Sequence, residues 1–207
     1  SGVRVRGSSK FTMTGGEIFG MGPNCNAETY GISAGGTSVQ LANVNIHDNL
    51  GYALAVGFST KAEVVNSTFL KNGASGNCGV PYANTVVSTL ASGELTLQNT
   101  IITLPHVGPN VVLVYNQNKM TITGGSVGEG AKTCIYSNDT LTLTGTTVAA
   151  CEKGIQIQNG TANFDGIKVQ NHATSGIEFI QGTLKMFNST VTNNGGAGLQ
   201  IQDEGVS

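Results

Sequence analysis

Histidine is the side chain best suited to acid–base chemistry and metal binding near neutral pH, and this sequence contains three. His47, His106 and His172 stand far apart, and none has a cysteine or a second histidine at a spacing typical of metal ligands. We therefore predict no metal site and no cofactor, and we expect each histidine to lie in a loop or on the surface.

The segment HDN at 47–49 places a histidine beside a carboxylate, an arrangement that can transfer protons. The segments LKN (70–72) and TNN (192–194) occupy the equivalent place in two other parts of the sequence, and they keep only the asparagine. Asn49, Asn72 and Asn194 are therefore interpreted as turn residues, and the sequence predicts no catalytic residue.

Threonine pairs offer a candidate binding surface. Thr121, Thr123, Thr142 and Thr144 form two T-x-T steps that lie 21 residues apart. On successive strands their hydroxyls would form a flat array, which resembles the ice-binding face of some antifreeze proteins. Threonine is also a favoured residue on any exposed sheet, so an ordinary solvent-facing surface remains the alternative.

The four cysteines favour disulfide bonds over a zinc site. They include no C-x-x-C motif and no Cys/His ligand spacing, and their number is even. Disulfides persist in oxidising compartments, so we expect an extracellular or cell-surface protein.

Composition excludes other classes of partner. Ten basic residues nearly balance twelve acidic ones, and no cluster of Lys and Arg is present to neutralise the phosphates of nucleic acid or an anionic membrane. No apolar stretch approaches the roughly 20 residues that a membrane span needs. We expect no nucleic-acid partner and no membrane insertion. Thirty glycines among abundant Thr, Asn, Val and Ile favour many short strands.

A repeated strand pattern runs through the chain. Its reference position, the anchor, is the second apolar residue of each strand, and a polar residue separates it from the first. This alternation predicts a strand with one buried face. Eight anchors recur at intervals of 21 to 33 residues: Met13, Leu41, Val64, Leu97, Ile122, Leu143, Phe164 and Met186.

Each anchor belongs to a longer unit. Two residues after every anchor stands Gly or Asn, which tolerate the left-handed backbone conformation, so the chain is expected to turn there. Five residues after it an apolar residue returns, as at Val127 and Val148, which we expect to stack in a second strand. A third strand precedes the anchor by about nine residues. Repeats of this length with variable loops predict a solenoid.

Three strands per coil, Gly or Asn at the corner and the long period resemble the pectate-lyase-like, right-handed parallel β-helix superfamily over almost the whole chain. The resemblance implies an all-β fold, a right-handed parallel β-helix solenoid of about eight coils with three short strands each. The superfamily contains pectate lyases, polygalacturonases and non-catalytic adhesins, so the fold leaves the function open.

Enzymes of this superfamily group their acidic residues on one face. On the strand before the anchor, no two acids are neighbours among the outward candidates, which are Arg4, Arg6, Ser33, Ala55, Ser88, Gln156, Gln158 and Glu178. The hydrolase motifs NTD, DD, GHG and RIK are absent. Catalysis is therefore not favoured.

The chain is interpreted as a single β-helix domain, 1–207, with loop insertions at about 19–30 and 71–85. Both insertions leave the same corner and each carries one cysteine, so we expect a Cys25–Cys78 clamp. Cys134 and Cys151, near the same edge of consecutive coils, then pair by elimination. Buried free thiols are the alternative.

These observations favour a non-catalytic extracellular or cell-surface β-helix, an adhesin-like or structural module that binds a glycan or a cell-surface protein. The alternatives are a polysaccharide lyase or glycoside hydrolase of the same fold and, third, an ice-binding protein. The first coil starts almost at once, and the pattern returns at Leu199 and Ile201 without a further anchor. We therefore expect part of a longer chain, or a subunit that associates end to end.

Overall fold

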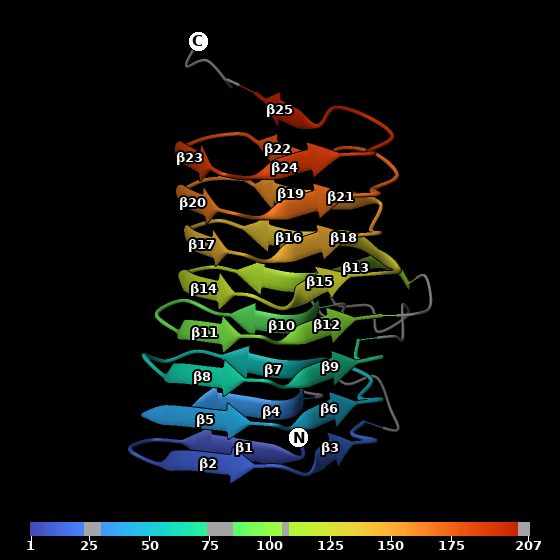
Figure 1. The fold of residues 1–207 in the computed structure, drawn as a ribbon. Coiled ribbons are helices and arrows are strands. Elements are labelled where there is room, and N and C mark those ends of the chain that lie inside the picture. Colours follow the sequence, from blue (N-terminus) through green and yellow to red (C-terminus); the bar gives the residue numbers. More distant parts are fainter. Residues whose placement is uncertain (23–29, 74–84, 105–107, 203–207) are drawn as a thin grey trace.

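The protein is a parallel β-solenoid whose coils stack along one axis (Figure 1). The computed structural model describes residues 1–22, 30–73, 85–104 and 108–202. These residues form strands that wind into three parallel sheets, and none of them is in a helix. The part of the chain that is described thus holds no helix long and apolar enough to cross a membrane.

Each coil contributes one strand to each sheet, so eight successive triplets of strands are followed by β25 among the described residues. The first sheet holds β1 (Val3–Arg6), β4 (Tyr30–Gly35), β7 (Tyr52–Val56), β10 (Thr85–Thr89), β13 (Gly108–Asn116), β16 (Ala131–Ser137), β19 (Lys153–Ile157), β22 (Ile177–Phe179) and β25 (Leu199–Ile201). The second holds β2 (Lys10–Thr14), β5 (Ser38–Ala42), β8 (Lys61–Val65), β11 (Glu94–Gln98), β14 (Lys119–Thr123), β17 (Thr140–Thr144), β20 (Thr161–Asp165) and β23 (Thr183–Phe187). The third holds β3 (Glu17–Phe19), β6 (Asn45–His47), β9 (Thr68–Leu70), β12 (Ile101–Thr103), β15 (Ser126–Gly128), β18 (Thr147–Ala149), β21 (Lys168–Gln170) and β24 (Thr190–Thr192).

The core is a set of aligned columns of apolar side chains inside the solenoid. Val127 and Val148 are Cα partners on β15 and β18, and both are buried. The anchors Ile122 and Leu143 are likewise partners on β14 and β17. The predicted strand register is confirmed, because period-two alternation in every coil brings the same columns inside.

The corner after each anchor has the predicted backbone. Every residue two positions after an anchor has positive φ, between 48° and 69°, and the eight are Gly15, Asn43, Asn66, Asn99, Gly124, Gly145, Gly166 and Asn188. Gly and Asn occur here because they adopt this conformation at lower cost than other residues. The corner therefore joins the second sheet to the third in the same way in each coil.

The connections from the third sheet to the first vary in length. β3 ends at Phe19 and β4 begins at Tyr30, and β9 ends at Leu70 while β10 begins at Thr85. Cys25 and Cys78 belong to these connections but lie outside the described residues, and His106 does too.

Candidate functional site

Two stacked tyrosines mark the outer face of the first sheet. Tyr115 on β13 and Tyr136 on β16 are Cα partners, and their ring centroids lie 5.4 Å apart at an interplanar angle of 19°. They belong to the outward column predicted from Arg4, Ser33, Ala55, Ser88, Gln156 and Glu178, and the strand pairing places all of these in one row. The tyrosines themselves were missed in the sequence, although both follow an apolar strand at the same place, as VYN and IYS.

Carboxamide side chains surround the two rings. The amide nitrogens of Gln117 and Asn138 donate to the Tyr115 hydroxyl at 2.9 and 3.4 Å, and the Tyr136 hydroxyl donates to the amide oxygen of Gln158 at 3.5 Å. Gln156 follows Tyr136 in the same row. We call these six residues, Tyr115, Gln117, Tyr136, Asn138, Gln156 and Gln158, the tyrosine–amide face.

The charges next to this face are paired. The Lys153 ammonium contacts the Glu178 carboxylate and donates to Gln156 at 3.3 Å, and Gln202 donates to the other Glu178 oxygen at 3.3 Å. Both charged side chains are largely buried. Glu178 is the one acid among the described members of the outward row, so this row does not bring two carboxylates together.

The predicted threonine array forms in register on the outer face of the second sheet. Thr121 pairs with Thr142, and Thr123 pairs with Thr144. The array is larger than the sequence indicated, because neighbouring positions of the same face also carry Thr96, Thr140, Thr161 and Thr183. Charged side chains border it, since Lys119 and Lys61 approach Glu94 at 3.7 and 3.9 Å.

The asparagines predicted to be turn residues form a hydrogen-bonded ladder at the corner that follows the third sheet. Asn49 and Asn72 are fully buried. The Asn72 side chain accepts from the Asn49 backbone N–H at 3.2 Å and donates to the Ile46 carbonyl at 2.8 Å. Asn49 makes the same two bonds one coil earlier, with Met21 N–H and the Ile18 carbonyl. These asparagines do lie at turns, as predicted, and Asn49 and Asn72 are buried because polar groups of stacked turns need internal partners.

His172 belongs to the same ladder; it lies in a connection between strands, as expected, but it is buried and not on the surface. Its side chain is 2% exposed. Nδ1 accepts from the Cys151 N–H at 3.2 Å and Nε2 lies 3.2 Å from the Val148 carbonyl, which makes the imidazole neutral with its proton on Nε2. Burial lowers the pKa of His172, and hydrogen bonding to the backbone only partly offsets this effect. Asn194 continues the ladder by accepting from the His172 N–H at 3.1 Å.

A disulfide closes the coil below His172. Cys134 on β16 and Cys151 after β18 are bonded, with a Cα–Cα distance of 5.7 Å. The predicted pairing is confirmed, but the two residues close one turn, β16–β17–β18, and do not join consecutive coils. Cys134, Cys151 and His172 hold their ligand atoms within 4.8 Å of one another, yet the bonded sulfurs are no longer thiolates and so cannot serve as metal ligands.

One family model, described as a right-handed β-helix region, matches residues 77–206. The chain belongs to the right-handed β-helix family. Neither the curated proteins nor the solved structures contain a significant match to this β-helix.

The family fixes the fold but not the chemistry of this β-helix, because one fold hosts many functions. A hollow of about 770 Å³ lies against the ladder corner, and small residues such as Ala150, Ala173 and Gly195 line much of it. Its charged lining residues are Lys132 and Glu152. The tyrosine–amide face places two stacked aromatic rings next to carboxamide groups.

Proposed function

We propose that this β-helix is a non-catalytic, adhesin-like binding module that acts outside the cell and binds a neutral glycan on its tyrosine–amide face. The observation that carries the proposal is the Tyr115–Tyr136 stack, with four carboxamides next to it. Binding sites generally combine aromatic surface with a few placed polar groups.

The chemistry of this face suits sugars. A carboxamide both donates and accepts hydrogen bonds, as a sugar hydroxyl does, and a tyrosine ring packs against the apolar C–H surface of a pyranose. Strands repeat about every 4.8 Å along the axis, which is close to the length of one sugar residue in an extended glycan. The paired Lys153 and Glu178 leave no net charge to select an acidic glycan.

The disulfide supports action outside the cell. Cys134 lies two residues before Tyr136, so the bond holds the strand that carries the second tyrosine. Such bonds form and persist in oxidising compartments.

Affinity for oligosaccharides tests the proposal directly. We expect isothermal titration calorimetry with neutral oligosaccharides, including β-linked gluco-, xylo- and N-acetylglucosamine series, to give binding that Tyr136→Ala weakens at least tenfold. Thr142→Ala is the matched control, since Thr142 lies on the second sheet, and it should leave the affinity unchanged. Loss of binding in Thr142→Ala alone would move the site to the threonine array.

The enzyme alternative has its own readout. We expect the same oligosaccharides, and polyuronates, to remain intact during long incubation. New reducing or unsaturated ends that disappear in Glu178→Gln would replace the proposal with the lyase or hydrolase hypothesis.

The ice-binding alternative rests on the in-register threonine array. Thermal hysteresis in a freezing assay, lost in Thr142→Ala, would favour it. The charged border formed by Lys119, Lys61 and Glu94 argues against it, since these groups hold liquid water.

A further inference from the structure

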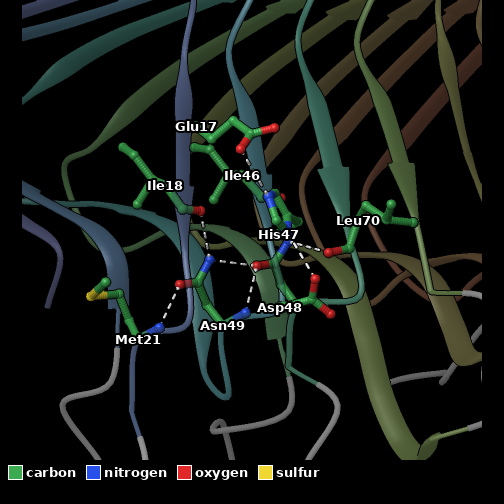
Figure 2. A network of polar contacts seen from close by, with 9 residues as sticks. Glu17, Ile18, Met21, Ile46, His47, Asp48, Asn49 and Leu70 are labelled. Atoms are coloured by element: carbon green, nitrogen blue, oxygen red, sulfur yellow. Dashed lines mark hydrogen bonds and ion pairs between the residues drawn. The ribbon is translucent and has the colours of Figure 1, made fainter.

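His47 lies on the outer face of the third sheet between carboxylates from two different coils (Figure 2). Its Nδ1 is 2.7 Å from Asp48 Oδ2, and its Nε2 is 3.9 Å from Glu17 Oε2 on β3. Phe19 stacks on the imidazole with ring centroids 5.0 Å apart and an interplanar angle of 5°. The ring is therefore held in one orientation, and its side chain is only 18% exposed.

Two buried acceptor atoms in this cluster have no hydrogen-bond partner. When His47 donates its Nδ1–H to Asp48, Nε2 carries a lone pair, and this atom is buried without a partner among the described residues. Asn45 precedes His47 by two residues on β6, so it faces the same side, and it is the Cα partner of Glu17. Its Oδ1 is also buried and unpartnered.

An imidazolium that bonds to both carboxylates does not explain the cluster. The Nε2 to Glu17 distance of 3.9 Å is too long for a hydrogen bond. Such an imidazolium would also leave Asn45 Oδ1 without a donor. A carboxylate, an amide oxygen and an imidazole lone pair thus stand at neighbouring positions of one face, and these are groups that bind a metal cation.

We propose that Glu17, Asn45 and His47 bind a divalent transition-metal ion such as Zn²⁺. Imidazole nitrogen favours zinc, copper or nickel over the hard ions calcium and magnesium. Asp48 acts as a positioning residue, because a histidine that ligates a metal through one nitrogen generally donates the other to a carboxylate. Zinc bonds to nitrogen and oxygen at about 2.0–2.2 Å, so Glu17, whose side chain is 56% exposed, needs only a small movement.

The sequence alone does not reveal the contact between Glu17 and His47, because the two residues stand thirty positions apart and one coil with its insertion separates them. This proposal revises the prediction that the chain binds no metal.

Zinc titration of the whole chain tests the site. With free thiols alkylated and no reductant present, we expect calorimetry to give one zinc ion per chain, and His47→Ala or Glu17→Gln to weaken binding at least tenfold. Asp48→Asn should weaken it about tenfold, as expected for loss of an orienting carboxylate. Asn45→Asp supplies a second carboxylate and should tighten it.

Two controls keep the result specific to these residues. Glu63→Gln on β8 and His172→Asn in the ladder should leave zinc affinity unchanged. Long-range ¹H–¹⁵N spectra of the unaltered protein should move the His47 Nε2 resonance on zinc addition, which tests the site even where a variant folds poorly. Absence of stoichiometric zinc binding, affinity unchanged in His47→Ala, or a stationary Nε2 resonance would overturn the proposal.

Discussion

The buried ladder makes the same two hydrogen bonds to the backbone in the lower and upper coils, but it makes them with different side chains. In the lower coils Asn72 joins the Asn49 N–H to the Ile46 carbonyl, and in the upper coils His172 joins the Cys151 N–H to the Val148 carbonyl. The position is thus defined by one acceptor and one donor, and an imidazole spans the same two backbone groups as a carboxamide. The difference is that only the imidazole can gain a proton near neutral pH.

The neighbouring column on the first sheet carries glycine beside both an asparagine and the histidine of the ladder. Gly154 faces His172, where an added Cβ would lie 2.8 Å from Cδ2 of the ring. Gly31 faces Asn49, where the distance to the side-chain nitrogen would be 3.3 Å. In the coil between, Cys134 and Cys151 fill the two positions with a disulfide. Glycine thus accompanies the hydrogen-bonding ladder residues Asn49 and His172, and a disulfide replaces this pair in the coil of Cys151.

The largest effect is expected from removing the Asn72 carboxamide, which makes the ladder hydrogen bonds in the lower coils. Asn72→Leu keeps the branched shape of the side chain but leaves the Asn49 N–H and the Ile46 carbonyl without these partners, and it removes one of the two bonds that the Asn49 side-chain amide donates. At roughly 1–3 kcal/mol for each such group, we expect a loss of about 4 kcal/mol in the free energy of unfolding. Urea denaturation measures it, with Asn163→Leu on the outer face as control. A loss below about 1 kcal/mol would contradict the ladder.

Removing the disulfide should have the next largest effect. Cys134 and Cys151 are 17 residues apart, and a loop of that length corresponds to about 3 kcal/mol of stabilisation. We expect the double variant Cys134→Ala/Cys151→Ala to lower the urea midpoint accordingly. If its midpoint equals that of the oxidised protein, this bond does not stabilise the upper coils.

The smallest effect on stability is expected from His172→Asn, which gives the upper coils the ladder side chain of the lower coils. At pH 8 we expect stability to change by less than about 1.5 kcal/mol, because Asn can make the same two bonds. The folded-state pKa of His172 is lowered by burial, so the stability that neutral His172 contributes is fully present above the unfolded value of 6.5 and is lost as pH falls from there through the folded pKa.

The variant should lack this component of acid sensitivity. Urea unfolding at pH 8 and pH 5 compares the two proteins. An equal loss of stability in both would show that protonation of His172 does not contribute.

The sequence predicted those features that recur in every coil. The corner residues and the Val127–Val148 stack follow from spacing alone, because each has the same residue type at each repeat. The ladder was missed since Asn and His make the same two backbone bonds with different side-chain chemistry, and Cys151 occupies the position with a disulfide. The Glu17–His47 contact was missed because insertions of unequal length hide which residues of successive coils become neighbours.

The disulfide that closes one coil has a mechanical consequence. A solenoid pulled from its two ends unwinds coil by coil, since each coil contacts only its neighbours. The Cys134–Cys151 bond transmits the pulling force directly between the two cysteines. The 17 residues of this loop, about 60 Å when fully extended, therefore do not lengthen while the bond is intact. Because the Cα atoms of the bonded cysteines already lie 5.7 Å apart, single-molecule pulling with and without reductant should yield contour lengths that differ by about 50–55 Å.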